Sequence, residues 1–336
     1  MVPTRGLAAM RRRTFITLLS GAAAAWPLAA RAQQREQKRV GVLAGTSEAE
    51  YRDRFALIRD GLAQLGWTEP RNLRIDYRWA DNRPELLEGY ARELLGLAAD
   101  VIVAEPGPAA EVFQRLTTTI PIVFITATDP VEAGYVQSFA HPGGNMTGFT
   151  LFEASLNSKW LELLKEIAPT VTRVAVLDPG ASARGRRDFA MIEAAAQTFA
   201  VTPVQALVKT EAADIARVIE ALAREPNGAM IVPPSNFFFR LRATIVKLAE
   251  QHRLPAIYSD RIYVDAGGLV SYGINRPDVH RRVPNYIDRI LRGATPGDLP
   301  VQAPTKYELV INIKTAKELG LSLSREFLLT ADEVIE

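Results

Sequence analysis

The sequence predicts an α/β protein of two lobes, each built on a parallel sheet with helices on both faces. Apolar, β-branched runs alternate with stretches of helical spacing, and strands that are apolar throughout are typical of doubly wound parallel sheets. The turn-rich segment 142–148 interrupts this alternation, and a second series follows it. The length of 336 residues also favours two domains, at roughly 100 to 200 residues each.

The first series opens with a strand at 39–44 and a helix in which Phe55, Ile58 and Leu62 recur at helical spacing. Gly66 follows this helix, where a C-terminus favours a residue that tolerates positive φ. Further strands are expected at 73–78, 100–104 and 121–125, and helices at 83–97 and 108–117.

The second series repeats the pattern and ends in a tail that must return across both lobes. Its strands are expected at 173–177, 228–232 and 255–258, and its helices at 155–167, 187–198, 213–223 and 239–252. The tail is expected to hold strands at 267–273 and 307–313, an extended segment at 300–304, and helices at 278–291 and 314–319. Pro284 inside the helix at 278–291 implies a late start or a kink.

Residues 1–32 have the three parts of a secretory signal. Arg11, Arg12 and Arg13 precede Phe15 and an apolar run at 16–30, and cleavage is expected after Ala32. The adjacent arginines resemble the twin-arginine signature, although the general secretory route accepts similar sequences. The apolar run is shorter than the roughly 20 residues that span a bilayer. The mature protein is therefore expected to be periplasmic, and translation starting at Met10 stays open as an alternative.

Composition excludes several classes of site and partner. The chain has no cysteine, so thiolate catalysis and disulfides are excluded. His141, His252 and His280 lie far apart, and we expect each on the surface and no metal site or cofactor. The formal net charge of +2 includes arginines of the expected signal, so neither nucleic acid nor an anionic membrane is a favoured partner.

Five motifs in order identify a family resemblance. They are His141-Pro-Gly-Gly-Asn-Met-Thr-Gly148, Gly267-Gly-Leu-Val-Ser-Tyr-Gly273, Leu299-Pro-Val-Gln-Ala-Pro-Thr-Lys306, Ile311-Asn-Ile-Lys-Thr-Ala-Lys-Glu-Leu-Gly320 and Ala331-Asp-Glu-Val-Ile-Glu336. Over residues 39–336 the chain resembles the ABC transporter substrate-binding proteins whose better-known members carry tryptophan or tyrosine. Where relatives often have Gly-Thr-Pro-Ala, this chain has Glu105-Pro-Gly-Pro-Ala109. This difference allows a ligand other than the one that those relatives bind. At the position of Pro284, relatives tend to carry alanine.

The resemblance implies a type I periplasmic-binding-protein fold with a three-segment hinge. The crossings between lobes are expected near 147–152, 272–275 and 303–306. The N-lobe is then 39–149 plus 275–304, and the C-lobe 150–274 plus 305–336. The resemblance also implies a small-molecule ligand, and as partners an ABC permease with its ATPase. A monomeric mature protein is expected.

Candidate ligand-binding residues follow the expected strands, because ligands of open α/β sheets sit beyond the carboxyl ends of the strands. The first lobe offers Thr46, Ser47, Glu105, Gly107, Thr128 and Asp129, and the second offers Ser182, Ser235, Asn236, Phe237, Ser259 and Asp260, with Tyr272 at a crossing. Hydroxyls and amides suit a carboxylate, aspartates an ammonium, and aromatic rings an apolar body. An amino acid or an aromatic acid fits this set.

Each candidate has a structural alternative. Thr46, Ser47 and Ser182 also suit helix N-caps, and Asp129 before a proline also suits a turn. Glu105 can equally face solvent, and the segment from Asn236 through the following phenylalanines can be a cap and core packing. The cluster 184–187 is expected to be a solvated loop, with contact to a transporter or an anionic ligand as the alternative.

The preferred function is capture of a solute by hinge closure, without catalysis. The sequence shows no Ser-His-Asp order, no paired histidines, and no phosphate-binding or dinucleotide glycine loop. A ligand-sensing module of a signalling system and an exported enzyme remain alternatives. A cytoplasmic repressor of this fold is excluded by the signal and by the missing DNA-binding helices.

Overall fold

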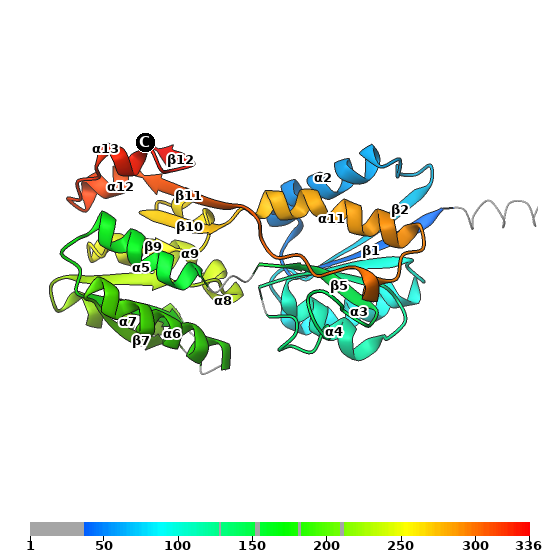
Figure 1. The fold of residues 1–336 in the computed structure, drawn as a ribbon, viewed down its shortest axis with the longest axis horizontal. Helices are drawn as coiled ribbons and strands as arrows, with labels where there is room; N and C mark the ends of the chain where they lie inside the picture. Colours follow the sequence, from blue (N-terminus) through cyan, green and yellow to red (C-terminus); the bar gives the residue numbers. More distant parts are fainter. Residues whose placement is uncertain (1–36, 128, 152–154, 181–182, 209–211) are drawn as a thin grey trace, which may run out of the picture.

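The chain forms two lobes that lie side by side (Figure 1). The computed structural model describes residues 37–336 apart from 128, 152–154, 181–182 and 209–211, so the expected export signal lies outside the described residues. The N-lobe contains a five-stranded sheet, and the C-lobe a seven-stranded sheet. The prediction of two sheet-based α/β lobes is confirmed.

The N-lobe is a parallel sheet in the order β2-β1-β3-β4-β5. Its strands are β1 (Lys38–Ala44), β2 (Leu73–Trp79), β3 (Val101–Glu105), β4 (Ile122–Thr126) and β5 (Met146–Thr150). Its helices are α2 (Glu48–Gln64), η1 (Pro84–Leu86), α3 (Leu87–Gly96), α4 (Gly107–Leu116), α11 (Arg276–Leu291) and η3 (Pro296–Asp298). The helices α2 and α11 cover one face, and α3 and α4 cover the other (Figure 1).

The strand β5 corrects one expectation for this lobe. Residues 146–148 were expected in the interrupting turn, yet they open a fully buried edge strand that pairs with β4. Gly148 explains the difference, because its φ of +154° and lack of a side chain let the backbone approach Phe124 closely. Gly148 therefore allows β5 to pair closely with β4.

The C-lobe sheet has the order β12-β11-β10-β9-β8-β6-β7, and only the pairing of β10 with β11 is antiparallel within its described strands. Its strands are β6 (Arg173–Asp178), β7 (Thr202–Leu207), β8 (Gly228–Val232), β9 (Ala256–Tyr258), β10 (Val270–Ile274), β11 (Tyr307–Asn312) and β12 (Glu333–Ile335). Its helices are α5 (Leu156–Ile167), α6 (Ala183–Ala196), η2 (Gln197–Phe199), α7 (Ala212–Ala223), α8 (Asn236–Arg240), α9 (Arg242–Gln251), α10 (Ile262–Asp265), α12 (Ile313–Glu318) and α13 (Arg325–Leu328).

Several C-lobe elements differ from the expected ones. The edge strand β7 was not predicted, because it contains Pro203 and is largely exposed. The short elements α13 and β12 were also missed. The cluster 184–187, expected to be a loop, lies inside α6, and the helix expected at 239–252 is divided into α8 and α9.

Pro284 neither delays nor ends α11. This helix starts at Arg276, two residues earlier than expected, because the side chain of Asn275 accepts a hydrogen bond from the backbone N–H of Asp278. The ring of Pro284 fits against Gly61 of α2, where an added Cβ would lie 2.5 Å from Cγ of Pro284. Close helix packing therefore accommodates the proline.

The chain passes between the lobes three times (Figure 1). It leaves the N-lobe sheet after β5, returns between β10 and α11, and leaves again between Gln302, which bridges to Phe149, and β11. In the described part of the chain, no helix is long and apolar enough to cross a membrane.

Candidate ligand-binding site

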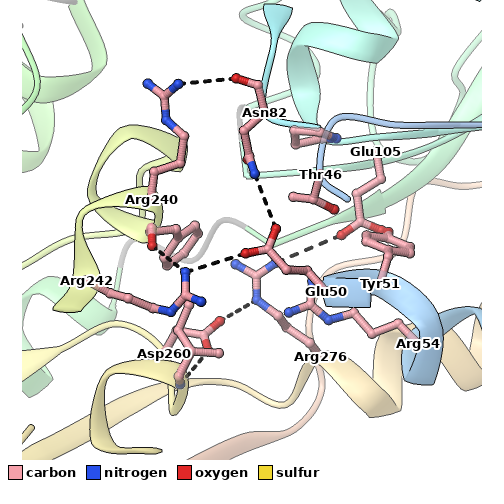
Figure 2. Close-up of a pocket in the computed structure, with 13 residues that line it drawn as sticks. Thr46, Glu50, Tyr51, Arg54, Asn82, Glu105, Arg240, Arg242, Asp260 and Arg276 are labelled. Atoms are coloured by element: carbon pink, nitrogen blue, oxygen red, sulfur yellow. Dashed lines mark hydrogen bonds and ion pairs between the residues drawn. The ribbon is translucent and has the colours of Figure 1, made fainter. Parts of the chain in front are cut away.

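A cavity of about 230 Å³ lies between the lobes, at the carboxyl ends of N-lobe strands (Figure 2). Its volume is slightly below the usual range for ligand pockets, which suits a small metabolite. It is lined by Thr46, Glu50, Tyr51, Arg54, Asn82, Glu105, Pro106, Phe239, Arg240, Arg242, Asp260, Ile262 and Arg276. Both lobes therefore contribute to one charged cavity.

The N-lobe side is built from the ends of strands and the start of α2. Thr46 lies in the loop after β1, and Glu105 is the last residue of β3. Glu50, Tyr51 and Arg54 lie on the first two turns of α2, where Arg54 neighbours Glu50 at spacing i, i+4 and Tyr51 at spacing i, i+3. The start of α2 thus places all three side chains along the cavity.

A buried polar cluster supports this side of the cavity. Glu105 Oε2 lies 2.9 Å from Nε2 of His280, and the hydroxyl of Tyr51 lies 3.2 Å from the same nitrogen. His280 Nδ1 donates to the carbonyl oxygen of Arg276 at 2.8 Å. The expectation that His280 lies on the surface is wrong, because α11 carries its ring into the interior, where it is 0% exposed.

The Nδ1 bond fixes the proton count of this cluster. A carbonyl oxygen only accepts, so Nδ1 of His280 carries a proton. The short contact between Nε2 and Glu105 then requires a further proton shared by the two groups. Wherever that proton resides, the Glu105–His280 pair is electrically neutral as a unit.

Polar contacts join the lobes around the cavity. Arg276 Nε donates to Oδ2 of Asp260 at 2.5 Å, and Arg242 Nη1 lies 3.6 Å from Oε1 of Glu50 (Figure 2). Arg240 Nη1 donates to the carbonyl oxygen of Asn82 at 3.2 Å. These contacts hold residues of α8, α9 and the β9 loop against the N-lobe.

Arg54 is the cavity arginine that stands apart from these bonds. Among the residues that the structure describes, its guanidinium has no hydrogen bond or ion pair, and it lies 5.5 Å from the centre of the Tyr51 ring. Figure 2 shows it directed into the cavity towards Arg276. Burial, and then the charge of Arg276, lower the pKa of Arg54 to about 10, against smaller opposing effects of Asp260 and Glu50. It is still cationic at neutral pH.

A smaller cavity of about 100 Å³ adjoins the first one. It shares Glu105, Pro106, Phe239 and Arg276 with its neighbour, and further lining comes from Gly107, Pro108, Ile125, Ala127, Leu151, Pro234 and Ser235. The cleft between the lobes therefore continues from the charged cavity towards the chain crossing after β5.

The structure brings together five of the predicted site residues. Thr46, Glu105 and Asp260 line the larger cavity, and Glu105, Gly107 and Ser235 line the smaller one. Thr128 and Ser182 lie outside the described residues, as does the side chain of Asn236.

Five other predicted residues lie elsewhere, with identifiable structural roles for most of them. The hydroxyl of Ser47 accepts from the backbone N–H of Glu50 as the α2 N-cap, and Asp129 accepts from the N–H groups of the turn that follows it. Phe237 packs on Phe238, 5.6 Å between ring centres, and Tyr272 stacks on Tyr307. The hydroxyl of Ser259 is buried without a hydrogen-bond partner among the described residues.

Other lining residues had not been predicted: Glu50, Tyr51, Arg54, Asn82, Phe239, Arg240, Arg242, Ile262 and Arg276. Two signals for them were present in the sequence. When a helix follows a strand, its first turns lie at the same edge of the sheet as the loop that joins the two. This placement favours Glu50 and Arg54, which follow the first expected strand. Arg276 directly follows an expected chain crossing, where both lobes are within reach.

This arrangement is suited to holding a small polar molecule. No group of three or more His, Asp or Glu residues in the described ranges is placed to hold a metal ion. The cavity offers guanidinium groups, a hydroxyl and two aromatic rings, which bind charge and apolar surface. Two sheet-based lobes around such a cleft define the type I periplasmic-binding-protein fold.

The chain belongs to the family described as ABC transporter substrate binding protein, whose family model matches residues 39–335. A tyrosine-binding protein of Clostridioides difficile (strain R20291) is 26% identical over 260 residues, covering 77% of this chain and 74% of that protein. A Streptococcus pneumonia ABC domain solved in complex with L-Trp is 26% identical, with a TM-score of 0.80 over 89% of this chain and 100% of that one. A conserved domain protein of Vibrio cholerae is 27% identical, with a TM-score of 0.80 over 89% and 99% of the two chains.

Proposed function

We propose that this protein is the extracytoplasmic solute-binding component of an ABC importer, and that it captures an amino acid or an aromatic acid between its lobes. The single observation that carries the proposal is the cavity to which both lobes contribute charged and aromatic side chains. Family membership and the tyrosine- and tryptophan-binding relatives support the same ligand class.

Capture proceeds by closure of the lobes about the three connecting segments, which act as the hinge. The contacts of Arg276 with Asp260 and of Arg242 with Glu50 join the lobes when they are close together. A ligand that touches both lobes adds further contacts to this arrangement alone, and so increases its population. The closed form is then the one that the permease distinguishes from the empty protein.

The remaining parts of the proposal concern export and assembly. The N-terminal segment directs the chain to the periplasm and is removed after about Ala32. The mature protein acts as a monomer that delivers its ligand to a membrane permease driven by an ATPase. The cavity requires no cofactor for this role.

Binding without turnover is the first expected result. At a concentration about 100 times its Kd, the true ligand stabilises the protein by about 2.7 kcal/mol, which raises Tm by roughly 5–10 °C. Thermal-shift screening of amino acids, aromatic acids and nucleosides measures this rise. Mass spectrometry of the mixture after prolonged incubation is expected to recover the ligand intact, and a new product would support an enzyme instead.

Two neighbouring phenylalanines provide a matched control. Phe239 lines the cavity, 5.0 Å from the guanidinium carbon of Arg276, whereas Phe237, in the same short helix α8, packs outside it. Phe239→Ala is expected to reduce the ligand-induced rise in Tm by at least about half, because it removes apolar contact area. Phe237→Ala is expected to leave it unchanged. Equal effects of the two variants would place the ligand elsewhere.

A further inference from the structure

The charges that line the cavity do not balance. Four arginines (Arg54, Arg240, Arg242 and Arg276) face three carboxylates (Glu50, Glu105 and Asp260). Glu105 is in addition neutralised by the buried His280 at 2.9 Å. The cavity therefore presents an excess of positive charge to whatever occupies it.

The carboxylates that could receive an ammonium group are already engaged. Asp260 accepts from Arg276 through one oxygen and from the backbone N–H of Ile262 through the other. Glu50 accepts from the side chain of Asn82 at 3.2 Å and faces Arg242. An incoming ammonium at either carboxylate would lie close to the guanidinium that already contacts it, and this repulsion between like charges disfavours ammonium binding.

The donors for an anion are, by contrast, vacant. Within the described structure, the guanidinium of Arg54 has no hydrogen bond or ion pair, and Oγ1 of Thr46 is buried without a hydrogen-bond partner. Both face the same cavity. The partly buried guanidinium of Arg54 therefore has free hydrogen-bond donors, which a carboxylate can bind in a bidentate manner.

We infer that the ligand is a net-anionic carboxylic acid with an apolar body and without an α-ammonium group, and that Arg54 binds its carboxylate. This inference rests on the proposed function and narrows the ligand class. The apolar body lies against Tyr51, Phe239 and Ile262, which line the same cavity. The chain would thus differ in ligand from relatives that bind zwitterionic amino acids.

The test compares matched pairs of compounds that differ only in the amino group. These are 3-phenylpropanoate and phenylalanine, 3-(4-hydroxyphenyl)propanoate and tyrosine, indole-3-propanoate and tryptophan, and 4-methylpentanoate and leucine. Isothermal titration at pH 7.5 uses the purified protein after denaturation and refolding to remove co-purified ligand. At least one desamino acid is expected to bind about tenfold or more tightly than its amino acid.

Variants of α2 test the role of Arg54. Arg54→Gln is expected to weaken binding of the preferred desamino acid by roughly 10- to 100-fold, because a charged hydrogen bond is lost. Arg52→Gln, on the same helix with a side chain 72% exposed, is expected to leave binding unchanged. The Tm of empty Arg54→Gln is expected to equal or exceed that of the parent, since an unpaired cation is removed, so weak binding would not reflect unfolding.

The possible outcomes separate the two proposals. Tighter binding of the amino acids in every pair, or unchanged affinity of Arg54→Gln, overturns this inference and leaves solute capture intact. Absence of binding to all eight compounds overturns the inference, while a ligand found in the wider thermal-shift screen would still support the proposed function.

Discussion

Gly148→Ala is expected to lower the free energy of unfolding by about 3 to 5 kcal/mol, through backbone strain and overpacking. An added Cβ would lie 2.0 Å from the carbonyl oxygen of Phe124 and 2.6 Å from its nitrogen. Both atoms belong to β4, where Phe124 is the register partner of Gly148, so strand pairing itself must shift. Urea unfolding followed by circular dichroism measures the change.

Gly144 provides the control for this substitution. It lies four residues earlier, and an added Cβ there would have no atom within 4 Å. Gly144→Ala is expected to change stability by less than about 0.5 kcal/mol. Equal stability of the two variants would show that β5 does not pair closely with β4 as described.

Glu105→Leu is expected to cost about 3 kcal/mol of stability, which lowers Tm by roughly 6–12 °C. In the parent protein the buried ring of His280 is hydrogen-bonded to the Glu105 carboxyl group. In the variant the ring faces an apolar side chain instead. His280→Leu is expected to cost a similar amount, because Glu105 then remains buried without this partner. Thermal unfolding of both variants measures these losses.

The double variant Glu105→Leu/His280→Leu distinguishes pairing from packing. Removing both members of a buried polar pair is often close to neutral, so the double variant is expected to be more stable than either single one. His141→Leu, at an exposed histidine, is the control and is expected to have little effect. Losses that add in the double variant would mean that the two groups contribute independently.

Much of the fold could be predicted because buried parallel strands have a strong local pattern. Every residue of β3 and β4 is buried, and the expected ranges differ from the observed ones by one residue at each end. β7 escaped prediction because an exposed edge strand that contains a proline lacks that pattern. The antiparallel pairing of β11 depends on where the tail returns, which periodicity does not encode.

The site was less accessible to sequence reasoning, because its members meet only through tertiary structure. Thr46, Glu105 and Asp260 were predicted from their positions after strands, where topology alone brings side chains together. His280 was expected on the surface because its helical pattern does not show which residue faces it. In the fold, the partner is Glu105 at the end of a neighbouring strand. The sequence carries signals that place Arg54 and Arg276 near the cleft, but whether their side chains enter the cavity depends on how two helices approach the opposite lobe.

The late position of α11 in the chain has a consequence for biosynthesis. Val279, Val283, Ile287 and Ile290 of this helix complete the core on one face of the N-lobe, whose strands are all made before residue 151. During translation, α2 is the only described helix on that face while more than a hundred further residues emerge. β11 and β12 complete the other sheet later still. Both lobes of a nascent chain are therefore complete only when its last residues have been made. Early termination of translation would leave apolar surface of each lobe exposed.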